Sequence, residues 1–135
     1  IPVMQANKFE GLVRRDAINP DYSTISPEKS GSYLGIDQID ITGIRAIEFD
    51  TSVPPEINSI SGWTIEVRLG SPDGKLAGKT GDIALEKNTP AKNRPIIQAD
   101  LIEVSGIHDV YFVFVNDNMK DENNRVQVRV IKFQH

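Results

Sequence analysis

The nine-residue run from Ile107 to Val115 constrains the fold more than any other stretch of the chain. It holds two Phe, one Tyr and four β-branched residues, a composition that favours a strand over a helix. Nearly every position after Asp109 is apolar, so we expect both faces of this strand to be covered, in the middle of a sheet that packs on a second layer. A buried helix is the alternative, but the run is short and follows Ser105-Gly106.

A clear hairpin pattern precedes this run. In residues 63–69 the apolar side chains alternate with polar ones, which predicts a half-buried strand: Trp63, Ile65, Val67 and Leu69 share one face, and Thr64, Glu66 and Arg68 share the other. The sequence Ser71-Pro-Asp-Gly74 then has the chemistry of a type I turn, and residues 76–81 return as the second strand. Trp63 is therefore expected in the core.

Weaker patterns predict strands elsewhere. They cover residues 3–9 (as an edge strand), 33–36, 45–50, 95–104 and 125–134. In the last of these, Val126, Val128 and Val130 are expected on one face, with Gln127 and Arg129 on the other.

Polar stretches separate these strands, at residues 11–32, 51–62, 82–94 and 116–124. The first is long for a loop in a compact domain, and such loops are often functional. No segment of twelve or more residues has a helical period, and there is no internal repeat or low-complexity linker. The chain is therefore predicted to be all-β: a single domain over residues 1–135, an antiparallel β-sandwich of about eight to ten strands, with a barrel as the alternative.

Charge and composition exclude several classes of function. The net charge is −4 with both signs scattered, which argues against nucleic-acid binding. No apolar run approaches the roughly 18 residues of a membrane span. Cysteine is absent, which excludes disulfides and thiolate metal sites. The first residues do not resemble a signal peptide and do not include an initiator Met, so we expect a processed or excised piece of a larger protein.

Catalytic residues are poorly supported, and the sequence predicts a protein that is not an enzyme. Ser105, His108 and Asp109 lie together, but in a strand His108 and Asp109 point to opposite faces, whereas a triad needs the His bonded to both partners. Two His and no Cys do not supply a zinc cluster. The polar stretch 116–124 is rich in oxygen ligands, but Lys120 stands where a calcium loop needs an acid or amide, so we expect a solvated loop.

Tyr22 is the aromatic residue that fits the pattern of a core least well. It lies in the first polar stretch beside Asn19 and Asp21, with no apolar pattern to bury it. An exposed Tyr in a loop is either a platform on which the apolar face of a sugar ring stacks or an anchor for the loop itself, and the residues leave both interpretations open.

Five segments resemble family 6 carbohydrate-binding modules in the same order along the chain. The hairpin over residues 63–78 is similar to the family's T-I-E-x-R-L-D strand with its S-P-x-G turn, and residues 104–114 are similar to its G-x-H-D-L-Y-L-V-F strand. Residues 4–9, 31–34 and 128–133 fall where the family has I-Q-A-E-D-Y, G-D-Y-L and I-D-W-I-x-F. The resemblance implies a jelly-roll sandwich that binds polysaccharide or oligosaccharide as an accessory module of a larger secreted, periplasmic or cell-surface protein.

Two departures from the family pattern concern its structural calcium. The positions of two calcium ligands hold Asn7 and Arg129, and an Arg does not ligate a cation. We therefore expect no cofactor and no metal, with the Arg129 guanidinium satisfying the oxygens that calcium would otherwise hold.

The resemblance also implies a sugar site at the loop end of the sandwich. Tyr22 matches the first of two stacking aromatics, Gln127 replaces an Asn, and no aromatic occurs around residues 94–97, where the second is expected. The predicted contacts are Tyr22 for stacking and Asn19, Arg94 and Gln127 for hydrogen bonds, with the open sheet face as a second possible place for a ligand. The alternative is a structural or protein-interaction sandwich that has lost sugar binding.

Overall fold

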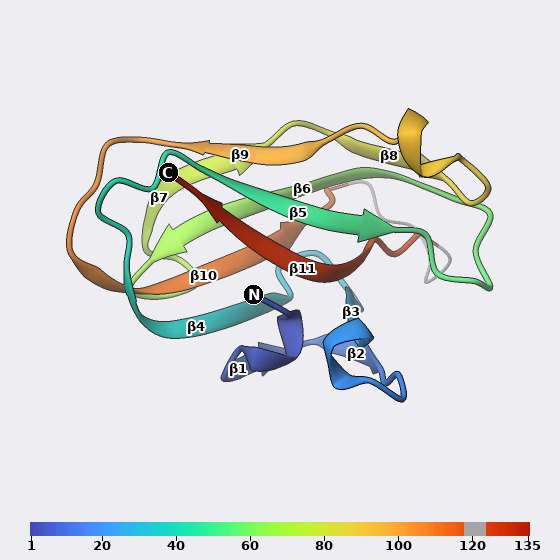
Figure 1. Cartoon of the computed structure of the whole chain (residues 1–135), viewed down its shortest axis with the longest axis horizontal. Coiled ribbons are helices and arrows are strands. Elements are labelled where there is room, and N and C mark those ends of the chain that lie inside the picture. The colour runs from blue at the N-terminus through green and yellow to red at the C-terminus, as the bar shows by residue number, and fades with distance from the viewer. Residues whose placement is uncertain (118–123) are drawn as a thin grey trace.

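The computed structural model describes residues 1–117 and 124–135, which form a sandwich of antiparallel strands (Figure 1). The strand order is β1-β4-β10-β6-β7-β9-β5-β11-β3-β2, with β8 paired to β6. The strands are β1 (Lys8–Glu10), β2 (Leu12–Arg15), β3 (Thr24–Pro27), β4 (Tyr33–Asp40), β5 (Ala46–Ser52), β6 (Ser59–Leu69), β7 (Lys75–Thr80), β8 (Ile83–Glu86), β9 (Ile97–Leu101), β10 (Ile107–Val115) and β11 (Gln127–Gln134). The predicted all-β sandwich is confirmed.

The central strand is β10, as the apolar run predicts. It pairs with β4 on one side and β6 on the other. Val110, Phe112 and Phe114 are buried toward the core, and Tyr111 and Val113 on the opposite face are also buried. Both faces of this strand are therefore covered, because each carries large side chains that pack against neighbouring elements.

Aromatic rings join the two layers of the sandwich. The ring of Phe112 on β10 lies 5.6 Å from that of Phe49 on β5 and 6.4 Å from that of Phe133 on β11, both edge to face. Trp63 is fully buried, and its indole nitrogen donates a hydrogen bond to the Asn124 carbonyl oxygen over 2.8 Å. The predicted core position of Trp63 is confirmed.

The N-terminal third differs from the prediction. Residues 3–9 do not form one edge strand: Val3–Gln5 is a 3-10 helix, η1, and β1 starts only at Lys8. The stretch 11–32 is not irregular, because it contains β2, the 3-10 helix η2 (Pro20–Tyr22) and β3. Gly11, with a φ of +67°, turns the chain between β1 and β2, which lie at the two ends of the strand order.

Three further predictions need correction. The stretch 82–94 contains β8 and the 3-10 helix η3 (Ala91–Asn93), and β6 begins at Ser59, inside a predicted loop. In β11 the pairing register shifts between Val128 and Val130, as in a β-bulge, so Ile131 rather than Val130 is buried. The predicted loop 116–124 lies mostly outside the described residues.

No helix among residues 1–117 and 124–135 is long and apolar enough to cross a membrane.

Candidate functional site

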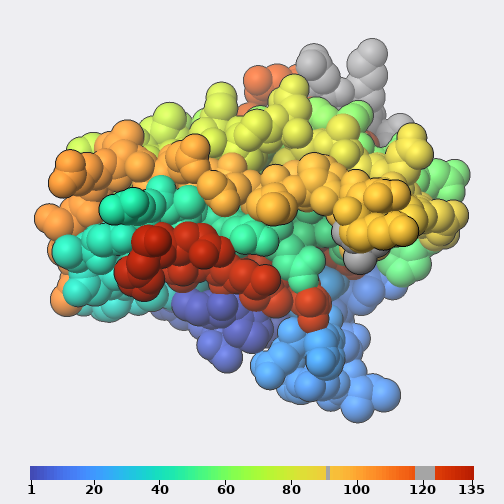
Figure 2. All heavy atoms as spheres, turned by 45° about the horizontal axis from the view of Figure 1, so that its top comes forward, coloured from blue at the N-terminus to red at the C-terminus, as the bar shows by residue number. Residues whose placement is uncertain are grey.

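Tyr22 is presented on a short, well-anchored turn. Pro20 is placed at the start of η2, and the Asn19 side-chain oxygen accepts a hydrogen bond from the Asp21 backbone nitrogen over 3.1 Å. The Tyr22 side chain is left 58% exposed. Figure 2 shows the segment from β2 to β3 (blue) projecting beside the face formed by β9, β5 and β11. The turn therefore holds an aromatic ring out in solvent, while Asn19 caps the turn through its side-chain oxygen.

Arg129 lies against the ring of Tyr22. The guanidinium carbon is 5.2 Å from the ring centroid, close enough for a cation–π contact. The same guanidinium donates to one carboxylate oxygen of Asp50, from Nε over 3.0 Å and from Nη2 over 2.6 Å. Both side chains of this ion pair are more than a third exposed, so its contribution to stability is at most about 1 kcal/mol. The contact orients the ring and occupies part of its surface.

Gln127 lies next to this ion pair in the β11–β5 ladder, directly opposite Ser52. Its side-chain oxygen accepts a hydrogen bond from the Ser52 hydroxyl over 3.0 Å, and the residue is 7% exposed. The amide nitrogen of Gln127 has no hydrogen-bond partner among the described residues, which leaves it as a spare donor in a largely buried side chain.

Arg94 follows η3 and lines a hollow of about 270 Å³ on the outer side of β5. Its Nε donates to the Thr89 carbonyl oxygen over 3.3 Å. Asp50, which holds Arg129 beneath Tyr22, lines the same hollow. Arg129 thus joins Tyr22 to Asp50, Asp50 and Arg94 line one hollow, and Gln127 lies two residues before Arg129 on β11. Asn19 is placed one turn earlier and is engaged in capping.

Other residues of this surface were missed by sequence reasoning. The hollow is also lined by Glu48 on β5, Lys132 on β11 and Ile96, whose side chain is 73% exposed in the region where an aromatic was sought. The alternation in residues 45–50, where Ile47 and Phe49 point to the core, places Glu48 and Asp50 on the outer face of that strand, although it does not place that face beside Tyr22. The alternation in residues 125–134 also places Arg129 on the outer face, but it does not place Lys132 there, because the bulge in β11 breaks the alternation.

The second place considered for a ligand is the outer face of β4 and β10. The rings of Tyr33 and Tyr111 meet edge to face at 5.6 Å. The Lys8 ammonium donates to the Tyr111 hydroxyl over 2.9 Å and to the Asp37 carboxylate over 2.7 Å, and the Asn7 amide donates to the same carboxylate over 2.6 Å. The hydrogen bonds to Asp37 and Tyr111 raise the pKa of Lys8. The hydrogen bonds from Lys8 and Asn7 lower the pKa of Asp37. The polar groups of this sheet face thus bind one another.

Asn7 and Arg129, which the sequence resemblance places at calcium-ligand positions, have separate partners. Asn7 binds Asp37, and Arg129 binds Asp50. No group of three or more His, Cys, Asp or Glu side chains that could hold a metal occurs among the described residues. The expectation that the protein needs no calcium stays a prediction.

The residues Ser105, His108 and Asp109 are engaged separately. A ring nitrogen of His108 lies 2.9 Å from the Ser105 backbone oxygen. The Asp109 carboxylate accepts hydrogen bonds from the backbone and side-chain nitrogens of Gln38, over 3.0 Å and 3.3 Å. The geometry of a catalytic triad, in which the His bridges the other two side chains, is not formed by these three residues.

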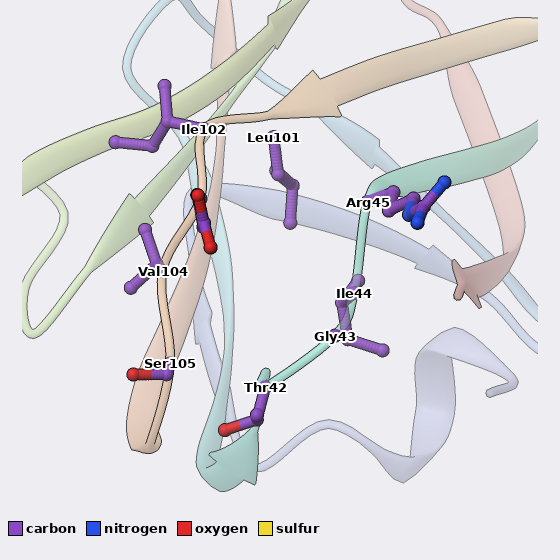
Figure 3. Close-up of a pocket in the computed structure, with 9 residues that line it drawn as sticks. Thr42, Gly43, Ile44, Arg45, Leu101, Ile102, Val104 and Ser105 are labelled. Atoms are coloured by element: carbon purple, nitrogen blue, oxygen red, sulfur yellow. The ribbon is translucent and has the colours of Figure 1, made fainter.

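A further hollow of about 480 Å³ lies at the other end of β5 (Figure 3). It opens between residues 42–45 and residues 101–105, and the Leu101 side chain projects into the gap between these segments. None of the predicted ligand contacts and no aromatic ring lines it. This hollow therefore gives no support to the predicted site.

No protein-family model matches the chain, and no curated protein matches it either. Several solved structures do. A family 6 carbohydrate-binding module from Clostridium cellulolyticum in complex with xylose superposes with a TM-score of 0.75 at 19% identity, covering 100% of this chain and 95% of that chain. CsCBM6-3 from Clostridium stercorarium, in complex with cellobiose, gives 0.70 at 20% identity, covering 99% and 91%.

A larger enzyme contains a similar unit. The family 43 arabinoxylan arabinofuranohydrolase from Bacillus subtilis, in complex with cellotetraose, matches 99% of this chain with 26% of its own length, at a TM-score of 0.73 and 17% identity. Because the matches to the separate modules cover nearly all of both chains, the resemblance extends to the whole architecture. The chain has the fold of the family 6 carbohydrate-binding modules.

Proposed function

We propose that the protein is a non-catalytic module that binds a polysaccharide or oligosaccharide at its loop-end surface, which we define as Tyr22, Asp50, Arg94, Gln127 and Arg129. The observation that carries the proposal is Tyr22, a residue that is 58% exposed on a capped turn beside polar side chains. Sugar rings have apolar faces that stack on aromatic rings and hydroxyl groups that accept hydrogen bonds, so a ring flanked by donors suits them.

The roles of the individual residues follow from their contacts. Tyr22 stacks on one sugar ring with one face, while Arg129 lies over the other face and fixes the orientation of the ring. Gln127 donates from its free amide nitrogen, and Arg94 donates from the rim of the neighbouring hollow. Asn19 positions the turn and offers its amide nitrogen to a ligand.

The module serves as an accessory domain of a larger secreted or cell-surface protein. The match to about a quarter of an arabinofuranohydrolase chain supports this arrangement, because there a unit of the same fold is joined to an enzyme. Binding would hold the parent protein near its polymer and raise the local concentration of substrate.

Affinity electrophoresis through gels that contain soluble xylans, β-glucans, mannans, agarose or acidic polysaccharides tests the proposal. We expect at least one polymer to retard the protein and Tyr22→Ala to abolish the retardation, while circular dichroism shows that the variant is folded. Retardation that survives Tyr22→Ala would move the site to the sheet face.

A structural or protein-interaction domain is the second candidate function. It is favoured by one observation: the residues that the resemblance predicts to carry a second stacking ring present Ile96 instead of an aromatic side chain. Absence of retardation by every polymer would make this the better account.

A further inference from the structure

The hollow beside Tyr22 has carboxylates that are already engaged. Glu48 accepts a hydrogen bond from the Gln134 side-chain nitrogen over 3.1 Å. Asp50 accepts two from Arg129 through one oxygen. Both acids line the hollow, and each carboxylate already accepts at least one hydrogen bond from another side chain of the protein. They are therefore weaker acceptors for the hydroxyl groups of a neutral sugar than free carboxylates would be.

The cationic side chains that line the same hollow, Arg94 and Lys132, have fewer partners than the carboxylates. Arg94 is exposed, and its side chain makes one hydrogen bond, from Nε to the Thr89 carbonyl oxygen. Both of its terminal Nη nitrogens lack a partner among the residues that the structure describes. Lys132 stands opposite Glu48 in the β11–β5 ladder but forms no ion pair with any of residues 1–117 or 124–135. The hollow thus offers two unpaired positive groups.

Two cationic side chains that line one hollow and have no ion-pair partner among the described residues favour an anionic ligand. The terminal nitrogens of a guanidinium present parallel N–H groups that match the oxygens of a carboxylate or a sulfate, and an ammonium adds a second charge-assisted bond. The exposed Ile96 side chain beside Arg94 supplies an apolar wall against which the carbon face of a sugar ring can pack.

We infer that the ligand is an acidic polysaccharide whose anionic group is bound between Arg94 and Lys132 while a neighbouring sugar ring stacks on Tyr22. This inference rests on the proposed function and names the class of polymer. The net charge of the chain is −4, so the molecule as a whole does not attract polyanions. Recognition is local to this hollow and weakens as salt screens the two charges.

The test measures binding of the folded chain to four polymers by isothermal titration calorimetry. Polygalacturonate carries carboxylates, carrageenan carries sulfate esters, and xylan and β-glucan are neutral. We expect binding to one of the two acidic polymers to be the tightest and to weaken with added salt. Comparison of the two acidic polymers identifies whether the anion is a carboxylate or a sulfate.

A matched pair of double variants tests whether binding of the acidic polymer depends on the two cations of the hollow. Arg94→Gln combined with Lys132→Gln is expected to weaken binding to the acidic polymer by at least about tenfold, because charge-assisted hydrogen bonds are lost. Lys29→Gln combined with Lys75→Gln removes the same charge from two exposed residues outside the hollow and should leave binding unchanged.

Two outcomes overturn the inference and are distinguishable. Tight binding to a neutral polymer alone, or an equal effect of the two double variants, rejects the acidic ligand while leaving the proposed function in place. If no polymer binds, acidic or neutral, both the inference of an acidic ligand and the proposed function are rejected.

Discussion

The loop-end surface and the sheet face both carry tyrosines beside charged groups, but they differ in how far those groups are satisfied. On the sheet face Tyr111 is 6% exposed and its hydroxyl accepts a hydrogen bond from Lys8, which also binds Asp37. At the loop end Tyr22 is 58% exposed, and Arg94 keeps donors without a partner in the described chain. A closed network stabilises the fold, whereas an exposed ring with spare donors is suited to a ligand.

The largest effect on stability is expected in the core beneath β10, which supports both regions. Phe112→Ala should lower the free energy of unfolding by about 3–5 kcal/mol, because the fully buried ring contacts Phe49 and Phe133 of the other layer. Urea denaturation measures the loss. Val113→Ala, on the outer face of the same strand, should cost less. Equal losses would contradict the assignment of the core to the Phe112 side.

The sheet face should affect stability but not binding. Tyr111→Phe removes the hydroxyl that accepts from Lys8 and should lower the free energy of unfolding by about 0.5–1.5 kcal/mol. Thermal denaturation and affinity electrophoresis, run on the same sample, separate the two effects. A loss of polysaccharide binding by this variant at temperatures where it is folded would place the ligand on the sheet face.

Acid should slightly weaken the hydrogen-bond network that Asn7, Lys8, Asp37 and Tyr111 form on the sheet face. The pKa of Asp37 is held below its ordinary value by the donors of Lys8 and Asn7, so the unfolded chain binds more protons between the two pKa values. This stabilisation is present above the ordinary pKa and is lost as the pH falls through the lowered one. The melting temperature should fall as the pH is lowered below about 5, and by less in Asp37→Asn. An equal fall in both proteins would assign the acid sensitivity to other carboxyls, such as Asp40 and Glu56, whose pKa values are also lowered.

Chelation should have no effect in either region. Arg129 and Asn7, which the sequence resemblance places at calcium-ligand positions, bind Asp50 and Asp37. Excess EDTA is therefore expected to leave the melting temperature unchanged. A drop of several degrees that added calcium reverses would show that a cation supports the fold.

The sequence predicted the parts of the fold in which burial is dense and regular. Nearly every residue of β10 after Asp109 is buried, and the β6 pattern alternates without interruption from Trp63 to Leu69, so composition and period both signal strands. The strands β2 and β3 were missed because each has only four residues: β2, at the end of the strand order, has no buried residue, and in β3 the buried residues Ile25, Ser26 and Pro27 follow one another without alternation. Such strands carry little hydrophobic pattern.

The candidate site was predicted in part for a similar reason. Tyr22 was recognisable because an aromatic residue in a polar stretch has no core to enter. Its neighbours Asp50 and Arg129 could not be assigned to it, because they belong to strands far apart in the sequence, and their contact depends on the β5–β11 register and on the bulge after Val128. Periodicity does not reveal a bulge or the partner of a strand.

The central claim is that a polysaccharide binds through Tyr22 and not through the tyrosines of the sheet face. Calorimetric titration of the wild type, Tyr22→Ala and Tyr33→Ala with whichever polymer retards the protein tests it most directly. We predict that Tyr22→Ala loses about 2 kcal/mol of binding free energy, on the order of 30-fold in affinity, while Tyr33→Ala binds like the wild type. Retained affinity in Tyr22→Ala together with lost affinity in Tyr33→Ala would contradict the account.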